Sequence, residues 1–325
     1  MSKLLVTGGA GFIGSHLIRA LIPLEEYDQI VAYDNLSTGN IENIKDLLRN
    51  TNFNFIQSDL LDSSTLEKTV CSCDAVFHLA ASSNVALGAV NSRIDYEQNL
   101  VTTYNLLEAM RKSPSCKRMI FASTAAVYGE VNRQSISESH SRPEPISLYG
   151  ATKLACESLV SGYCHMYDMS SVIVRLANII GPGTHGVVQD FITKLTSNPK
   201  YLEILGNGMQ RKSYLYISDC IEALNKLSQI VEKKAFDIFN LGSDDNITVS
   251  KIADIIIHEL DLTEVKRKFI DKYDGRGWIG DVREFMLDCS KMKQMGWQPR
   301  FRSKAAVIAT VRDYLTKKAR SLYQK

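Results

Sequence analysis

The sequence predicts an α/β protein with a doubly wound parallel sheet and a smaller, mixed α/β C-terminal lobe. Short, almost wholly apolar runs alternate with segments of helical apolar spacing, a pattern typical of strands that helices cover on both faces. A turn rich in glycine joins the first of these runs to the first helical segment. Together these features indicate a parallel sheet whose ligand lies at the carboxyl ends of its strands.

Length and composition are those of a globular protein with one large domain or two packed domains. The chain has 325 residues, of which 45% are hydrophobic and 23% are charged. Its net charge of +2 provides no broad field for attracting nucleic acid or an anionic membrane. Seven scattered cysteines favour a reducing compartment, and neither an apolar signal core nor a run of about 18 apolar residues occurs. We therefore expect a cytoplasmic protein that binds neither nucleic acid nor membrane.

The expected elements follow in order along the chain. Seven strands are predicted at residues 3–7, 30–34, 53–57, 75–79, 119–123, 172–176 and 236–241. Helices are predicted between them at residues 12–21, 96–111 and 147–166. Beyond Gly181-Pro182 the pattern loosens, and further helices are expected at residues 187–196, 219–231, 249–260 and 303–317. The polar segment at residues 130–144 is predicted to be a surface loop.

The glycine turn has the spacing of a dinucleotide-binding site. Gly8, Gly9, Gly11 and Gly14 satisfy both Gly-x-Gly-x-x-Gly and Gly-x-x-Gly-x-x-Gly directly between a strand and a helix. The first glycines permit a tight turn, Gly11 lets a pyrophosphate approach the backbone, and Gly14 lets the helix lie close to the sheet. The helix N-terminus adds unpaired N–H groups and partial positive charge. A Rossmann-type sheet is therefore expected.

An acidic residue at the end of the second strand indicates which dinucleotide binds. Asp34 lies 20 residues beyond Gly14, where its carboxylate can accept both ribose hydroxyls of an adenosine and would repel a 2′-phosphate. No arginine follows at once, so NAD is expected rather than NADP. Asp59 is expected at the adenine, with an exposed turn carboxylate as the alternative. The predicted cofactor contacts in this part of the chain are Gly8, Gly11, Phe12, Ile13, Gly14, Asp34, Asn35, Asp59, Leu60, Leu79, Ala80 and Ala81.

A tyrosine and a lysine four residues apart are the expected reactive pair. On a helix, Tyr149 and Lys153 share one face. Bringing a phenol within about one unit of neutral pH requires roughly 3 kcal/mol, which a nearby ammonium and an oxidised nicotinamide help to supply. Tyr149 is then a general base for a substrate hydroxyl, and Lys153 also holds the nicotinamide ribose. Thr124, at the carboxyl end of a strand, is expected to hydrogen-bond the reacting oxygen, while Ser123 either braces the cofactor or caps the loop.

These motifs together resemble the extended short-chain dehydrogenase/reductases. The glycine turn, Ser123-Thr124, Tyr149-x-x-x-Lys153 and the segment from Arg175 to Pro182 carry the likeness, which is strongest to NAD-dependent nucleotide-sugar epimerases of the UDP-glucose 4-epimerase type. The resemblance implies that Tyr149 removes the C4 hydroxyl proton while the C4 hydride passes to NAD. It further implies that the resulting 4-keto sugar rotates and receives the hydride on its other face. It also implies a homodimer.

The resemblance places the substrate on both parts of the chain. The change of pattern after Gly181-Pro182 and the return to a strand near Phe236 predict an NAD-binding domain of residues 1–180 plus about 214–245, and a nucleotide-sugar-binding lobe of about 181–213 plus 246–325. Which of the nearby cations touches the pyrophosphate is left open, and Phe285 either narrows the hexose subsite or belongs to the core. The implied substrate-binding residues are Val85, Thr124, Tyr149, Asn178, Arg211, Lys212, Arg276 and Phe285.

Two alanines narrow the expected reaction. Sugar 4,6-dehydratases of this superfamily carry Asp-Glu directly after the Ser/Thr, and UDP-glucuronate decarboxylases carry Glu one place later, whereas this chain has Ala125 and Ala126. Epimerisation rather than elimination is therefore expected, and the bulk of Phe285, where it narrows the hexose subsite, favours UDP-glucose and UDP-galactose. A UDP-N-acetylhexosamine 4-epimerase, a nucleotide-sugar dehydratase and a dinucleotide-sensing protein without turnover are the alternatives. The six histidines show no metal-ligand spacing, so no metal is expected.

Overall fold

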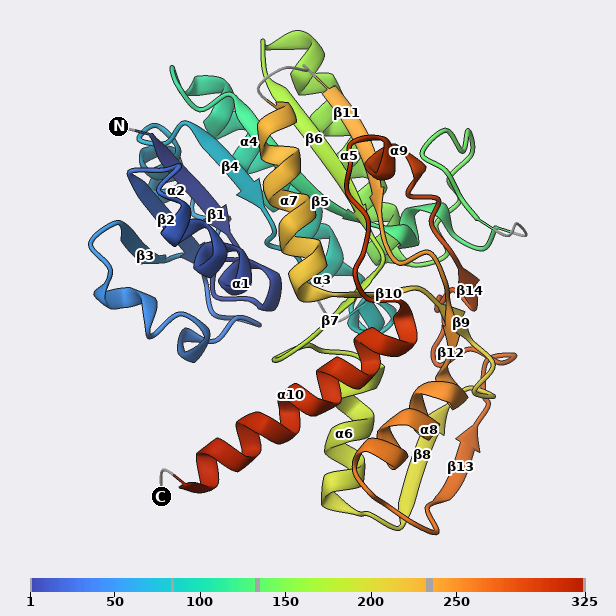
Figure 1. Ribbon diagram of the computed structural model, residues 1–325. Helices are drawn as coiled ribbons and strands as arrows, with labels where there is room; N and C mark the ends of the chain where they lie inside the picture. The colour runs from blue at the N-terminus through green and yellow to red at the C-terminus, as the bar shows by residue number, and fades with distance from the viewer. Residues whose placement is uncertain (1, 83–84, 132–134, 232–235, 324–325) are drawn as a thin grey trace. The chain divides into compact units, whose positions relative to one another are not determined.

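The computed structural model describes residues 2–82, 85–131, 135–231 and 236–323. It divides into two compact units, each built from three segments of the chain (Figure 1). Unit 1 consists of Met1–Val127, Ser147–Arg175 and Ile221–Phe239. Unit 2 consists of Tyr128–Ile146, Leu176–Cys220 and Asn240–Lys325.

The central sheet confirms the predicted fold class. Its seven strands have the order β11-β6-β5-β4-β1-β2-β3, and the pairs from β5 to β3 are parallel. Strand order runs outward in opposite directions from β1 and β4, which makes the sheet doubly wound (Figure 1). The strands are β1 Lys3–Thr7, β2 Gln29–Asp34, β3 Phe53–Gln57, β4 Ala75–His78, β5 Arg118–Thr124, β6 Ser170–Leu176 and β11 Phe236–Leu241.

Helices of unit 1 pack on this sheet through apolar faces. Leu5 and Val76 from the sheet share a core with Leu106 of α4 and Val160 of α5. The helices are α1 Phe12–Leu21, α2 Ser63–Val70, α3 Ser92–Asp95, α4 Thr102–Lys112 and α5 Leu148–Met166. Short helical turns lie at η1 Ile22–Leu24, η2 Ile41–Asn43, η3 Leu47–Arg49, η4 Val85–Ala89 and η6 Ala125–Tyr128.

The helix predicted at residues 96–111 is interrupted. Its first part is a π-helical turn, η5 Tyr96–Val101, which leads into α4. A π-turn holds an extra residue per turn and shifts the side chains that follow, so a search for regular helical spacing does not detect it. The helix predicted at residues 147–166 matches α5, where the Ser147 hydroxyl accepts a hydrogen bond from the Gly150 N–H at 3.1 Å and caps the N-terminus.

Unit 2 has its own core and three small sheets. Parallel strands β7 Asn178–Ile180 and β10 Tyr214–Tyr216 form one pair, and β8 Tyr201–Leu205 with β13 Lys266–Ile270 forms another. The third sheet joins β12 Ile247–Thr248, β9 Arg211–Lys212 and β14 Glu284–Phe285. The helices are α6 Val187–Ser197, α8 Val249–Glu259, α9 Ser290–Gln294 and α10 Ser303–Tyr323, and α7 Ile217–Val231 begins in unit 2 and ends in unit 1.

The described residues of the segment 130–144 form no helix or named strand and are mostly exposed or half-buried, which agrees with the predicted surface loop, but specific contacts also hold the segment. Ile136 is buried and forms a bridge with Leu287, and Gly129 forms a bridge with Glu144. These contacts explain why Tyr128–Ile146 belongs to unit 2, although the expected boundary placed all of residues 1–180 in one domain. Residues 132–134 of this segment lie outside the described residues.

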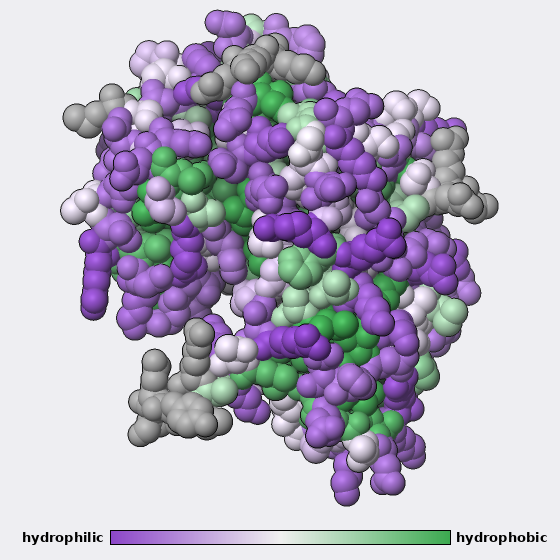
Figure 2. Space-filling model, viewed as in Figure 1, coloured by the Kyte–Doolittle hydropathy of each residue, from purple (hydrophilic) through white to green (hydrophobic). Residues whose placement is uncertain are grey.

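Hydrophilic side chains cover most of the face shown in Figure 2, with smaller apolar areas between them. Within the described part of the chain, no helix has the length and apolar character needed to cross a membrane.

Candidate active site

The glycine turn has a backbone that excludes side chains. Gly8 has a φ of +69°, and its N–H donates to the Tyr33 carbonyl at 2.9 Å. A Cβ on Gly14 would overlap the carbonyl oxygen of Gly8, so any larger residue would push α1 away from the turn. Gly11 is the N-cap of α1 and offers no side-chain acceptor, which leaves N–H groups of the first turn available to an anion.

Asp34 is fixed beside this turn. One carboxylate oxygen accepts from the Ala10 N–H at 3.0 Å and the other from the Leu36 N–H at 2.8 Å. Burial raises the pKa of Asp34, and these two backbone hydrogen bonds oppose the rise. Each oxygen keeps a further lone pair, so the carboxylate can also accept hydroxyl donors such as those of a ribose.

The remaining predicted cofactor residues border the same strand ends. The Asn35 amide donates to Asp59 at 2.7 Å, which ties the end of β2 to the segment after β3. After β4, the Ala80 N–H donates to the Thr7 hydroxyl at 3.3 Å, and a Cβ on Gly8 would lie 2.8 Å from the Ala80 nitrogen. A turn with no room for larger residues at its glycines, the Asp34 carboxylate and the open N–H groups of the first turn of α1 therefore meet at one sheet edge. This set fits a dinucleotide.

Tyr149 and Lys153 lie in the first turns of α5, as the spacing predicts. Lys153 is only 2% exposed; its ammonium donates to the Ala122 carbonyl at 2.8 Å and lies 4.7 Å from the centre of the Phe121 ring. The Thr124 side chain, at the end of β5, is close enough to the Tyr149 phenol to lower its pKa. The structure therefore brings Thr124 and Tyr149 together and places Lys153 beside the same strand.

The protein alone does not make Tyr149 more acidic. Burial and the charge of Asp95 raise the pKa of Tyr149 to about 12, and the Thr124 side chain offsets only part of this rise. Lys153, which was expected to lower the pKa of Tyr149, does not do so here. Lys153 is itself buried, which lowers its pKa to about 8, so its charge is only partial near that pH.

Ser123 belongs to a buried network rather than to an open loop. Its hydroxyl donates to Glu157, and the same carboxylate accepts from Arg175 at 3.0 Å through Nε and 2.6 Å through Nη2. The Arg175 and Glu157 side chains are 5% and 4% exposed. Sequence reasoning missed Glu157, although its place four residues after Lys153 puts it on the Tyr149 face of the helix.

Two further buried polar residues were also missed. The Asn99 amide accepts from the Ser82 N–H at 2.9 Å and donates to the Thr152 hydroxyl at 3.0 Å, which links the segment after β4 to α5. Asp95 is fully buried, and no hydrogen-bond partner is found for either of its oxygens in the described part of the chain. Burial raises the pKa of Asp95, and the nearby Ser82 and Asn99 oppose part of the rise. Val85, predicted to line the sugar pocket, begins η4 in the same part of unit 1.

In unit 2, the structure brings several predicted substrate residues together on β9 and β14. Lys212 pairs in register with Phe285, and the Arg211 N–H donates to the Arg283 carbonyl at 2.7 Å. Phe285 is only 8% exposed and thus lies largely in the core. The Asn178 amide donates to the carbonyl of Ser213, the residue after β9, at 3.2 Å.

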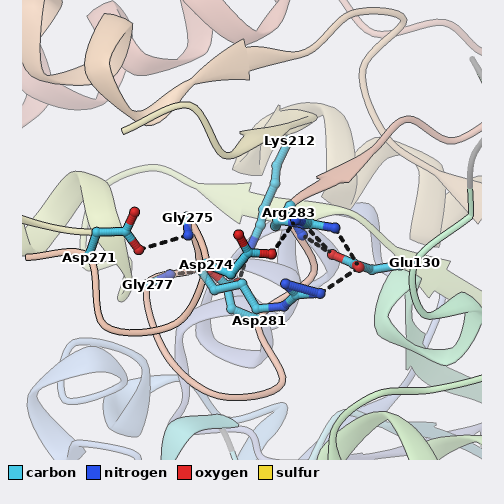
Figure 3. Close-up of polar contacts among 9 residues, drawn as sticks. Glu130, Lys212, Asp271, Asp274, Gly275, Gly277, Asp281 and Arg283 are labelled. Carbon is cyan, nitrogen blue, oxygen red and sulfur yellow. Dashed lines mark hydrogen bonds and ion pairs between the residues drawn. The ribbon is translucent and has the colours of Figure 1, made fainter. Parts of the chain in front are cut away.

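Two of the three predicted cations are paired with carboxylates. Lys212 forms an ion pair with Asp281, and Arg276 forms one with Glu130 at 2.5 Å between Nη2 and Oε2 (Figure 3). Arg211, the first residue of β9, is exposed. Glu130 and Asp281 were not singled out from the sequence, because their partners are distant in the chain.

The residues described by the structure contain no group of three or more His, Cys, Asp or Glu side chains able to hold a metal ion.

Residues 4–242 match the model of the NAD dependent epimerase/dehydratase family. A putative UDP-glucose 4-epimerase of Methanocaldococcus jannaschii is 34% identical over 95% of this chain and 97% of its own length. A dTDP-D-glucose 4,6-dehydratase of Mus musculus is 31% identical over 96% of this chain and 88% of its own length. A crystal structure of a UDP-galactose 4-epimerase matches with a TM-score of 0.85 and 35% identity, covering 97% of this chain and 99% of that one. The chain therefore belongs to the NAD-dependent epimerase/dehydratase family, and its cofactor is NAD.

Proposed function

We propose that this protein inverts C4 of a UDP-hexose, interconverting UDP-glucose and UDP-galactose. The observation that carries the proposal is the set of Thr124, Tyr149 and Lys153 with Ala125 and Ala126 beside it. The set supplies a base for a sugar hydroxyl but no carboxylic acid next to Thr124 for eliminating water. The names of the Methanocaldococcus relative and of the UDP-galactose 4-epimerase structure support the same reaction.

The base in this proposal is the Tyr149 phenol. Deprotonated, its oxygen accepts the proton of the C4 hydroxyl, and the Thr124 hydroxyl holds that oxygen in line. Burial and the charge of Asp95 raise the pKa of Tyr149 to about 12, so stabilising its phenolate needs further positive charge nearby. NAD, which the glycine turn and Asp34 would hold, would supply positive charge and hydride-transfer chemistry at this site.

In the same proposal, the residues of unit 2 bind the nucleotide. Arg276, Arg211 and Lys212 are the candidate cations for the pyrophosphate, and guanidinium forks match phosphate oxygens well. Asn178 and the largely buried Phe285 of unit 2 are proposed to bind the substrate, as is Val85 of unit 1. A firm hold on UDP with a looser hold on the sugar lets the keto sugar expose its other face.

The test is to incubate the purified protein with UDP-galactose and to follow the products by NMR. We expect UDP-glucose to appear at unchanged mass. If only UDP-N-acetylglucosamine and UDP-N-acetylgalactosamine interconvert, the N-acetylhexosamine epimerase is the correct function. A product that has lost one water would identify a dehydratase, the activity named for the Mus musculus relative. Binding of NAD without any turnover would identify the dinucleotide-sensing alternative.

A homodimer is proposed as well. Large apolar side chains are exposed on the helical segment η5–α4 and on α5, including Tyr96, Tyr104, Leu148 and Met166, and a second copy of the chain would cover them. Light scattering should give twice the mass of one chain; the mass of a single chain would contradict the proposal.

A cytoplasmic location is also proposed, and it is supported by the cysteines, all seven of which are free and six of which are buried.

A further inference from the structure

Glu130 is saturated with hydrogen bonds. One carboxylate oxygen accepts from the Arg283 Nε at 3.0 Å and from the Arg283 backbone N–H at 3.2 Å. The other accepts from Arg276 Nη2 at 2.5 Å and from Arg283 Nη2 at 3.2 Å. Partial burial alone would raise the pKa of Glu130, but the hydrogen bonds from Arg283 and the charges of both arginines lower it. Glu130 is therefore a firmly ionised anchor for two guanidinium groups (Figure 3).

The two arginines differ in what remains free. All three guanidinium nitrogens of Arg283 are occupied, because Nη1 also donates to Asp274 at 3.0 Å. Arg276 uses only Nη2, and among the described residues no partner is found for its Nε and Nη1. Its side chain is 20% exposed. Arg276 thus keeps two nitrogens without a partner among the described residues for an anionic ligand, whereas every guanidinium nitrogen of Arg283 already donates a hydrogen bond.

Carboxylates also brace the loop that carries Arg276. Asp271 accepts from the Gly275 N–H at 2.7 Å, and Asp281 accepts from the Gly277 N–H at 3.1 Å (Figure 3). The residues directly before and after Arg276 in the chain are therefore both held. Gly206 packs closely against the same loop, because a Cβ on Gly206 would lie only 2.9 Å from the carbonyl carbon of Arg276. Backbone and guanidinium are therefore both fixed before any ligand arrives.

We infer that Glu130 is a positioning residue for the substrate diphosphate: it fixes Arg276 through Nη2 so that Nε and Nη1 face the phosphate oxygens. This inference rests on the proposed binding of a UDP-sugar. It also separates Arg276 from its neighbours Lys212 and Arg283, because Lys212 is paired with Asp281 and Arg283 with Glu130 and Asp274. Arg276 is then the principal diphosphate contact among these three.

A simple charge argument predicts the opposite effect of losing Glu130. Removing this carboxylate makes the net charge of the cluster more positive by one unit, and the cluster would then attract a diphosphate more strongly. Positioning predicts weaker binding, because a released arginine side chain must be ordered again when the ligand binds. The sign of the change in affinity therefore separates the two accounts.

The experiment measures binding of UDP and uridine by calorimetry to the full-length wild type, Glu130→Ala, Arg276→Ala, the double variant, and Glu259→Gln. Glu259 is a matched control because it also holds an arginine, Arg312, through both oxygens in unit 2, outside this cluster. UDP binding by the wild type tests the proposed function, and only the differences between variants test the role of Glu130.

We expect Glu130→Ala to weaken UDP binding about tenfold and to leave uridine binding unchanged. Arg276→Ala should cost at least as much, and the double variant should bind UDP no more weakly than Arg276→Ala alone, because Glu130 acts through Arg276. KM for the UDP-sugar should rise with kcat nearly unchanged, and Glu130→Gln should retain part of the affinity. Tighter UDP binding in Glu130→Ala, equal losses for UDP and uridine, or additive losses in the double variant would each overturn the inference.

Discussion

In unit 1, backbone hydrogen bonds hold the residues expected to bind the cofactor, whereas in unit 2 side-chain charges hold the residues expected to bind the diphosphate. Asp34 is held by two N–H groups, and the glycine turn is shaped by its own carbonyls. Arg276 and Lys212 are held by carboxylates. The difference teaches that a backbone site can be recognised from a local motif, while a site built from ion pairs depends on contacts between distant parts of the chain.

The largest expected effect is the loss of activity on removing the proposed base of unit 1, a change that should leave the fold intact. Tyr149→Phe removes only the phenol oxygen, so kcat should fall about a thousandfold because the base is gone. NAD binding and the melting temperature should remain close to those of the wild type. Activity within tenfold of the wild type would show that another group removes the proton.

A second change tests whether the polar network beneath the site is needed for stability. Glu157→Gln leaves the buried Arg175 guanidinium without its counter-charge, and we expect a loss of about 3 kcal/mol in the free energy of unfolding. The matched change in unit 2 is Glu259→Gln, whose partner Arg312 is exposed, and it should cost less than about 1 kcal/mol. Equal losses in urea denaturation would contradict the contrast between the two ion pairs.

A third change addresses cofactor recognition. Asp34→Asn keeps the shape of the side chain but removes the charge that strengthens hydrogen bonds to ribose hydroxyls, each worth about 1.5–3 kcal/mol. The Kd for NAD should rise about 10- to 100-fold, and discrimination against NADP should weaken. Fluorescence titration with both cofactors measures this, and an unchanged preference would place the ribose elsewhere.

A fourth prediction concerns the pH dependence of stability. Burial lowers the pKa of Lys153 to about 8, so the folded protein binds fewer protons than the unfolded chain between about pH 8 and pH 10.5. Stability from this group must therefore rise with pH across that window and is lowest below pH 8. Lys153→Met removes the buried charge, and its melting temperature relative to the wild type should be highest near pH 7 and fall as pH rises. A difference that does not vary with pH would refute this account of Lys153.

The same contrast explains what the sequence could predict. The seven strands and the glycine turn were predictable because their requirements lie in neighbouring residues, and so was the placement of Tyr149 and Lys153 on one helix. Glu157 was within reach of the same four-residue spacing. Glu130 was not, because its partners Arg276 and Arg283 lie 146 and 153 residues away along the chain. The π-turn around Asn99 was hidden because it interrupts regular helical spacing.

The central claim is that a hydride leaves C4 of the sugar and returns to the same carbon after Tyr149 has taken the hydroxyl proton. The most direct measurement uses UDP-galactose with deuterium at C4 in ordinary water, with NMR and mass analysis of the product. The account predicts UDP-glucose that retains the deuterium at C4. Loss of the label to solvent, or its appearance on another carbon of a dehydrated sugar, would contradict it.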